Sequence, residues 1–280
     1  AALRLSLLDA AQELQESART VAAALKKLGG EHKNVALPGY THMQQGMPST
    51  VELWAGGFAA ELEDDADGIA NACRRISKNP LGSAAGYGTP GIPVDREHTS
   101  AALGFDTVHS PVTAVQLSRG KAEANLVFEL CMLMQDLGKL ASDLLLYYTQ
   151  EFAFIRLPEN MTTGSSIMPQ KRNPDVLELV RGATATINAS LAEILGITTK
   201  LSSGYQRDLQ RLKPPLFRAI DLAGASAEIM AHLVSGVEFI AENIELDDAI
   251  FAAEQANKLV VEKGISFRDA YLQVARDLKA

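Results

Sequence analysis

The residues best suited to chemistry lie in the range 162–174, which reads Thr-Thr-Gly-Ser-Ser-Ile-Met-Pro-Gln-Lys-Arg-Asn-Pro. Gly164 lacks a Cβ, so the backbone there can turn tightly or move. Ser165 and Ser166 offer hydroxyl groups for proton transfer, and Lys171 offers a cation for an anionic group. A loop of this composition before a helix is ordinarily only a connector. The two hydroxyls and the lysine also fit a mobile lid that takes part in catalysis.

The loop leads into a helix that would hold it in place. Pro174 suits the first turn of that helix. A spacing of three then puts Asp175, Glu178 and Arg181 on one face of a helix expected over 175–201. The sequence therefore predicts a mobile, hydroxyl-rich loop anchored on a rigid element.

The string in 162–174 resembles the signature loop of the aspartase/fumarase superfamily, whose members eliminate fumarate from a succinyl-bearing substrate. Gln170 after the proline, followed by Lys-Arg-Asn-Pro-Asp, looks most like the argininosuccinate lyase branch. The resemblance implies that Ser165 is the catalytic base and that Lys171 and Asn173 stabilise the anionic intermediate. The chemistry of the residues alone leaves Ser165 and Ser166 open, because either hydroxyl could transfer a proton.

A second candidate site lies in the range 37–44, which reads Leu-Pro-Gly-Tyr-Thr-His-Met-Gln. A lone histidine in a loop is more often a hydrogen-bonded structural residue. This string, however, resembles the argininosuccinate lyase pattern around the catalytic histidine, which implies catalysis by His42 and substrate binding by Thr41. In the superfamily that histidine pairs with a carboxylate after the signature loop, and Glu178 holds the matching position. A glutamate beside an imidazole raises its proton affinity and suits the ring to hold a proton near neutral pH.

The implied reaction is a β-elimination that releases fumarate and arginine from argininosuccinate. A base removes a proton from the carbon next to a carboxylate, and the doubly charged carboxylate that develops must be stabilised. Serine is a poor base in water, so dehydration and a nearby cation must favour its alkoxide. No metal or cofactor is expected, because the five histidines show no paired metal-ligand spacing.

A third segment, over 204–213, reads Gly-Tyr-Gln-Arg-Asp-Leu-Gln-Arg-Leu-Lys. A similar string in argininosuccinate lyases contacts the arginine half of the substrate, which implies substrate binding by Tyr205, Gln210 and Lys213. Uncharged donors and acceptors suit a guanidinium and an α-amino acid better than a purine ribotide, which would need phosphate-binding cations. One departure concerns the lysine, since acidic residues commonly flank it in the family whereas Leu212 and Pro214 do so here.

The glycine-rich range 80–97 resembles a further Pro-Leu-Gly-Ser and Asp-Arg-Glu segment of the family. Its glycines permit close approach of a neighbouring backbone or ligand. Arg96 is a weak candidate for contact with a carboxylate or phosphate. An ordinary turn-rich loop is the alternative.

Composition narrows the class of protein. The chain has 280 residues, 47% of them hydrophobic and 21% charged, and it has no apolar run long enough to cross a bilayer. Its net charge of −8 argues against binding to nucleic acid. Cys73 and Cys131 are the two cysteines, and buried, reduced thiols in a cytoplasmic protein are the preferred interpretation. No signal segment opens the sequence.

The hydrophobic pattern predicts a mainly α protein, a bundle of long helices without a convincing β-strand. We expect a central helical-bundle domain over 1–246 and the start of a small C-terminal helical domain over 247–280. The range 112–152 is apolar around so much of its circumference that it must be buried on several sides. The helices are expected over 3–28, 51–76, 95–103, 112–152, 175–201, 214–242, 247–263 and 266–279.

The helical pattern is already under way at Ala1 and still present at Ala280, so we expect the sequence to be a fragment. By resemblance, the N-terminal region and part of the C-terminal region of the family pattern are missing. The superfamily packs long helices of four subunits into one core and builds each active site from three subunits. The resemblance therefore implies a homotetramer with shared active sites, acting on a small molecule, and a fragment that can be inactive alone.

Two alternatives stay open at this point. One is adenylosuccinate lyase or another fumarate-releasing lyase, against which Gln170 and the segment 204–213 argue. The other is a catalytically silent structural protein like the δ-crystallins, which resemble the same branch. Retention of the Thr-His pair, the serine, the lysine and the glutamate favours an enzyme.

Overall fold

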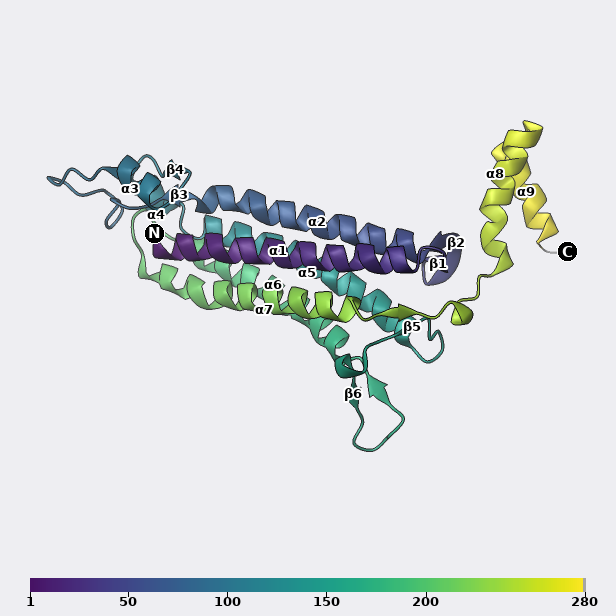
Figure 1. Ribbon diagram of the computed structural model, residues 1–280. Helices are drawn as coiled ribbons and strands as arrows, with labels where there is room; N and C mark the ends of the chain where they lie inside the picture. The colour runs from purple at the N-terminus through teal and green to yellow at the C-terminus, as the bar shows by residue number, and fades with distance from the viewer. Residues whose placement is uncertain (279–280) are drawn as a thin grey trace.

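The structure, a computed structural model, describes residues 1–278. Within these residues, five long helices run side by side along the molecule (Figure 1). Each helix has apolar residues at a spacing of three and four, so each buries one stripe against its neighbours. α1 packs on α2 and α7, and α5 packs on α2, α6 and α7. The five are α1 (Ala2–Glu31), α2 (Val51–Ile76), α5 (Lys121–Tyr148), α6 (Asp175–Thr198) and α7 (Lys213–Val234).

The apolar segment predicted over 112–152 is not one helix. Gly120 has a φ of 85° and separates the short α4 (Ala114–Leu117) from α5. α5 itself is buried along its length, as its apolar circumference predicts, and contributes a large part of the core. The backbone turn at Gly120 therefore sets where the central helix begins.

The first helix, expected over 3–28, extends through two glycines that follow this range. α1 continues through Gly29 and Gly30 to Glu31. A Cβ on Gly29 would lie 3.2 Å from the Cβ of Ala55, so the glycine lets α1 and α2 approach closely. The glycine is thus a packing feature of the helix rather than its end.

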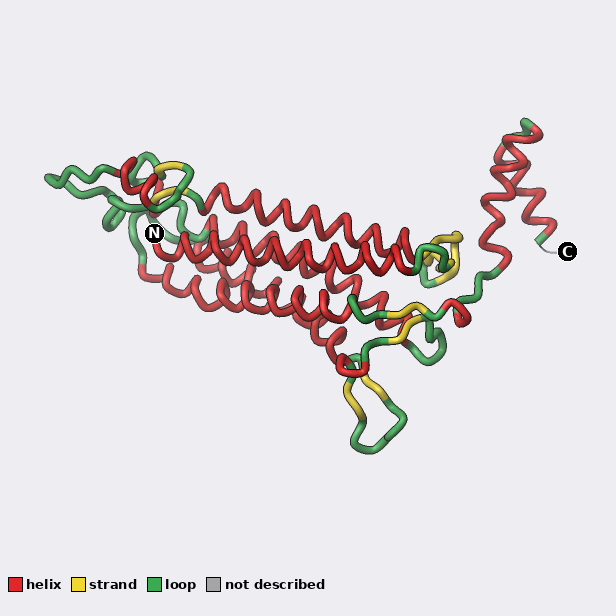
Figure 2. The backbone as a smooth tube through the Cα atoms, in the orientation of Figure 1, coloured by secondary structure: helices red, strands yellow, loops and turns green. Residues whose placement is uncertain are grey.

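The expectation that the chain contains no strand is wrong. Within the described residues 1–278, eight short strands form four two-stranded sheets, which Figure 2 shows beside the dominant helices. The longest pair is a hairpin in the segment expected to be a connector, and its Pro38 and Pro48 face each other across it. Proline is tolerated here because each strand of a two-stranded sheet is an edge. The pairs are β1 (Ala36–Thr41) with β2 (Gln44–Thr50), β3 (Lys78–Asn79) with β4 (Thr107–Val108), β5 (Ile155–Arg156) with β8 (Glu238–Phe239), and β6 (Thr163–Gly164) with β7 (Arg172–Asn173).

The end of α7 also differs from the prediction. The helix was expected to reach about residue 242, but it ends at Val234, and β8 then pairs with β5. A Cβ on Gly236 would lie 2.4 Å from Cγ of Pro158, so only glycine lets the chain pass there. The remaining short elements are α3 (Arg96–Ala102), capped by the side chain of Asp95, and the 3₁₀ turns η1 (Glu159–Met161), η2 (Arg207–Leu212), η3 (Ala241–Asn243) and η4 (Asp248–Phe251).

The last two helices lie apart from the bundle (Figure 1). α8 (Ala252–Lys263) and α9 (Phe267–Asp277) bury a small cluster of Ala256, Ala270 and Val274, which is separate from the main core. This separation supports the predicted boundary near residue 247, which stays a prediction. Among residues 1–278, no helix combines the length and apolar character that crossing a bilayer requires.

Candidate functional site

The serine loop projects from the side of the bundle (Figure 1). β6 and β7 pair Thr163 with Asn173 and Gly164 with Arg172, so the residues between them form an exposed loop. At its base, Thr163 Oγ1 donates a 2.5 Å hydrogen bond to Asp175 Oδ2, and Arg172 forms an ion pair with Glu159. The predicted arrangement, a loop anchored on a helix, is therefore present.

The geometry distinguishes the two serines. Ser165 Oγ accepts hydrogen bonds from the backbone N–H of Ile167 at 3.3 Å and of Met168 at 3.1 Å. Ser166 is exposed, and no described residue forms a hydrogen bond with its hydroxyl in the structure. Donors aimed at one oxygen stabilise negative charge on that oxygen. In the described structure, the loop thus surrounds Ser165 Oγ, and not Ser166 Oγ, with backbone donors.

The other predicted residues of this segment lie on both sides of the loop. Lys171 is exposed, and its backbone N–H donates to Met168 O at 3.0 Å. Asn173 is half-buried in β7, and its Nδ2 lies 3.5 Å from Thr163 Oγ1. Glu178 is exposed in the first turn of α6, whereas the carboxylate of Asp175 accepts a hydrogen bond from Thr163. This segment alone therefore presents a hydroxyl, an ammonium and a carboxylate to the surface.

Thr41 and His42 lie at the turn of the β1–β2 hairpin, at the end of α1 and α2. His42 and Met43 have φ values of 52° and 61°, the left-handed conformation that a tight two-residue hairpin turn requires. His42 is exposed, and no hydrogen bond or ion pair joins it to Glu178 within the described chain. The predicted pair of His42 and Glu178 is thus not formed inside one subunit.

The third group lies at the opposite end of the bundle. Gln210 Nε2 donates to the hydroxyl of Tyr205 at 3.2 Å, and the backbone N–H of Tyr205 donates to Ala85 O at 3.2 Å. Gln210 and Lys213 line a cavity of about 450 Å³. Other residues around this cavity are Arg4, Leu81, Ser83, Gln116, Arg119 and Glu123.

The glycine-rich loop of 80–93 forms one wall of this cavity. Arg96, the weak candidate for contact with a carboxylate or phosphate, uses two of its nitrogens on backbone carbonyls. Arg96 Nε donates to Leu81 O at 2.7 Å, and Nη2 donates to His109 O at 2.9 Å and Asn79 O at 3.3 Å. Its role is therefore to hold the loop in shape.

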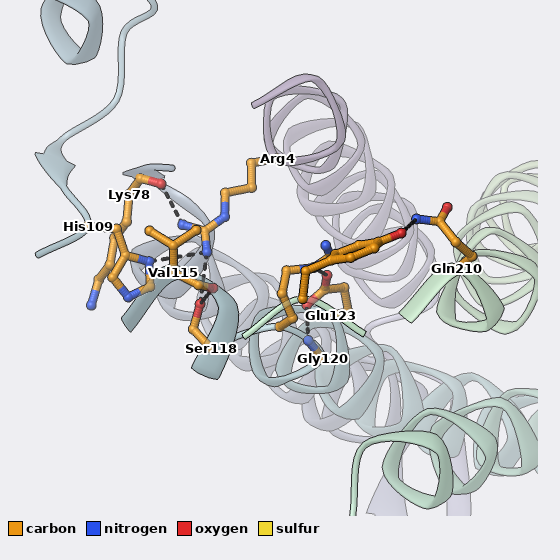
Figure 3. A network of polar contacts seen from close by, with 10 residues as sticks. Arg4, Lys78, His109, Val115, Ser118, Gly120, Glu123 and Gln210 are labelled. Atoms are coloured by element: carbon orange, nitrogen blue, oxygen red, sulfur yellow. Dashed lines mark hydrogen bonds and ion pairs between the residues drawn. The ribbon is translucent and has the colours of Figure 1, made fainter. Parts of the chain in front are cut away.

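Sequence reasoning missed a buried arginine beside the same cavity (Figure 3). Arg4 donates to Lys78 O and Ser118 Oγ, and its Nη2 also lies 3.2 Å from His109 Nδ1. Burial and the cations of Arg4, Lys78 and Arg96 lower the pKa of His109 to about 4, so the ring is neutral at pH 7. The available signal was the position of Arg4 on the apolar stripe of α1, three residues before Leu7.

The serine loop and the Tyr205 segment are too far apart to meet on one small molecule. α6 separates Asn173 from the segment that leads to Tyr205, and its 24 residues span about 36 Å. Figure 1 shows the hairpin and the serine loop projecting from different parts of the bundle. Among residues 1–278, no three His, Cys, Asp or Glu residues are grouped so that they could hold a metal ion.

Comparison with known proteins decides the family. A family model described as "Lyase" matches residues 1–188, which is more than half of the 280-residue chain. The chain belongs to this lyase family. Its sequence is 42% identical over 281 residues to the argininosuccinate lyase of Sorangium cellulosum, an alignment that covers 100% of this chain and 65% of that protein. The argininosuccinate lyase of Parabacteroides distasonis is 40% identical over 272 residues, covering 96% of this chain and 60% of that protein.

Solved structures define the fold of this chain. The structure of EDDS lyase in complex with formate matches with a TM-score of 0.90 and 28% identity, over 97% of this chain and 54% of that chain. A class II fumarase from Schistosoma mansoni matches with a TM-score of 0.79 and 18% identity, over 96% of this chain and 65% of that one. The chain therefore has the mainly α-helical aspartase/fumarase fold, and the predicted fold class is confirmed. The chain spans 60–65% of the length of the two argininosuccinate lyases.

Proposed function

We propose that the whole protein is an argininosuccinate lyase, which cleaves argininosuccinate to fumarate and arginine. The observation that carries the proposal is about 40% identity to argininosuccinate lyases over nearly the whole chain. A variant of EDDS lyase with bound fumarate is also similar, at 27% identity and a TM-score of 0.90, which supports fumarate as the product. The products need no redox partner, because the reaction moves one proton and breaks one carbon–nitrogen bond.

The serine loop supplies the chemistry of proton abstraction in this proposal. Ser165 removes the proton next to a carboxylate of the succinyl half, since its oxygen is the one that two backbone N–H groups contact. The doubly charged intermediate is then stabilised by the ammonium of Lys171 and the amide of Asn173. Closure of the exposed loop over the substrate excludes water and strengthens both interactions.

The active site is shared between subunits in this proposal. Thr41 and His42 of one subunit meet the serine loop and Glu178 of a second, and Tyr205, Gln210 and Lys213 come from a third. The support is geometric, because the helix length of about 36 Å exceeds what one small substrate can span. A glutamate from another subunit beside His42 would orient the imidazole toward the leaving nitrogen.

A homotetramer is the assembly that we propose. α6 exposes an unusually apolar outer face, on which Leu179 is 72% exposed and Leu195 is 50% exposed. Between them lie the small exposed residues Gly182, Ala185 and Ala189, which let a second helix approach closely. Packing of this face against other copies would bury it. We place the protein in the cytoplasm, which the two free thiols of Cys73 and Cys131 support.

The test is fumarate release, followed by its ultraviolet absorbance, from argininosuccinate and separately from adenylosuccinate. We expect activity on argininosuccinate, a loss of at least about 10³-fold in Ser165→Ala, and a much smaller loss in the matched control Ser166→Ala. Activity on adenylosuccinate alone would overturn the choice of substrate. Equal losses in both serine variants would overturn the assignment of the base, and an inactive, intact tetramer would favour a structural protein.

A further inference from the structure

Arg119 is a strong cation in the substrate cavity to which sequence reasoning assigned no role. It lines the cavity together with Gln210 and Lys213, although it comes from the α4–α5 turn. Its side chain is 21% exposed, so it lies largely inside the protein. A guanidinium at the wall of a cavity can bind a carboxylate through two parallel hydrogen bonds.

Within the described residues, only the Nε atom of the Arg119 guanidinium contacts a protein acceptor. Its Nε lies 3.5 Å from Glu123 Oε1, and the structure shows no hydrogen bond from either of its NH₂ groups to a residue in the range 1–278. Glu123 is occupied on its other side as well, because its Oε2 accepts from Gly120 N at 2.9 Å. Glu123 thus orients Arg119 through Nε and leaves the fork of NH₂ groups available.

The turn that carries Arg119 is rigid. Ser118 Oγ donates to Val115 O at 2.8 Å and accepts from Arg4 Nη2 at 3.1 Å (Figure 3). On its other side, Gly120 packs so closely on α6 that a Cβ there would lie 2.2 Å from Thr198 Cγ2. A fixed turn reduces the entropy lost when a ligand binds.

The charge of the cavity favours an anion. Among the described side chains that line it, those of Arg4, Arg119 and Lys213 are cationic and that of Glu123 alone is anionic. The NH₂ groups of Arg4 contact protein acceptors, so the cations of Arg119 and Lys213 are the ones that can bind a ligand. A guanidinium would be repelled here, whereas a carboxylate would find both cations.

An acceptor for an ammonium group lies in the same wall. Gln116 lines the cavity, and its buried Oε1 has no hydrogen-bond donor in the described structure. A buried acceptor without a donor is costly, so a ligand N–H that reaches it gains free energy. A cavity of about 450 Å³ is large enough for an amino acid.

We propose that Arg119, with Lys213, binds the α-carboxylate of the amino-acid half of the substrate, and that Gln116 accepts a hydrogen bond from its α-ammonium group. Arg119 is then a specificity-determining residue for the leaving amino acid, and the inference rests on the proposed function for the identity of that amino acid. The guanidinium of arginine would extend away from these cations. The lack of acidic residues beside Lys213 agrees with this polarity.

The experiment is calorimetric titration of the intact protein with L-arginine and with agmatine, which lacks the carboxylate. We expect the wild type to prefer arginine, and Arg119→Gln to bind arginine about 10- to 100-fold more weakly while its affinity for agmatine changes little. Arg211→Gln is the matched control, because Arg211 is an exposed cation of η2 that does not line the cavity. It should keep the preference for arginine.

Arg119→Lys separates loss of the ligand contact from loss of the fold, because lysine keeps the positive charge but lacks the two NH₂ groups of arginine. An intermediate loss of arginine affinity with an unchanged circular dichroism spectrum supports the proposal. Equal binding of arginine and agmatine by the wild type, no binding of either, or a preference retained in Arg119→Gln would overturn it. Fumarate release by the same wild-type sample reports on the proposed function separately, because binding of arginine does not require turnover.

Discussion

At the scale of single residues, neighbouring side chains of the same type have different surroundings. Lys171 and Arg172 are adjacent cations in the serine loop, yet only Arg172 is paired, through Glu159 at the base of the loop. Lys171 forms no ion pair with any described residue, so its charge is available to a substrate. This difference gives a matched pair of variants.

Lys171→Met should lower the turnover rate with argininosuccinate by about 10²- to 10³-fold, because it removes the cation next to the developing negative charge. Arg172→Met removes the same charge from an exposed ion pair and should lower the rate by less than about tenfold. Steady-state fumarate release measures both. A larger loss in Arg172→Met than in Lys171→Met would show that loop anchoring, rather than charge stabilisation, limits the reaction.

Asp65 of α2 is a buried carboxyl that serves no predicted site. Its side chain is 7% exposed, and its Oδ2 has no hydrogen-bond partner in the described structure. Burial, and then the charges of Asp136, Asp64, Glu61 and Glu129, raise its pKa to about 7. The carboxyl is therefore protonated in the folded protein at a pH where the unfolded chain has lost that proton.

Stability should fall as pH rises from about 4 to about 7, since the folded state then binds the extra proton more tightly than the unfolded state. The loss of folding free energy caused by ionising Asp65 reaches its full value above about pH 7. Asp65→Asn should remove it and raise the free energy of unfolding at pH 8 by about 1–3 kcal/mol, with little effect near pH 4. Denaturant unfolding at both pH values tests this. A less stable variant at pH 8 would mean that the charged carboxylate has a partner.

At the scale of elements, the interface of α1 and α2 depends on one of two adjacent glycines. Gly29 faces α2, where a Cβ would lie 3.2 Å from Cα of Glu52, whereas Gly30 has open space around its Cα. Gly30→Ala should stabilise the protein by about 0.5–1 kcal/mol through helix propensity. Gly29→Ala should be less stable than Gly30→Ala by at least about 1 kcal/mol, because α2 must move. Thermal unfolding of the two variants measures the difference, and equal midpoints would argue against close packing here.

The long helices follow from the sequence because their burial is periodic. The bounds of α2 were predicted to the residue, and Thr50 caps it through its side chain. The β-hairpin was missed because Pro38, Gly39 and Pro48 are poor strand formers, and only pairing with a partner strand stabilises them. The early end of α7 depends on contact with Pro158, which lies far away in sequence.

In the candidate site, too, local sequence patterns predicted some residues, whereas others depend on contacts between distant segments. Its residues came from recognisable strings, and the local geometry of Ser165 could then be read from its own loop. Arg119 was missed because its importance depends on Lys213 and Gln210, which fold against it from another element. No local pattern contains such a contact. The pairing of His42 with Glu178 stays a prediction.

At the scale of the whole molecule, the separation of the three groups predicts complementation between subunits. His42→Asn and Ser165→Ala should each be nearly inactive alone. After the two proteins are mixed, unfolded and refolded together, some shared sites contain neither change, so activity should return. Fumarate release from the mixture measures it. A mixture as inactive as its components would show that each subunit forms its own site.

A side-chain amide joins the hairpin to the segment that leads into the C-terminal helices. Gln45, in β2 close to His42, donates from Nε2 to Glu245 O at 3.1 Å and accepts at Oε1 from Asp247 N at 3.0 Å. These two bonds join the strand next to His42 to the segment that leads into α8. If His42 acts in catalysis as we propose, a displacement of residues 245–247 would be transmitted through Gln45 to the turn that carries its imidazole.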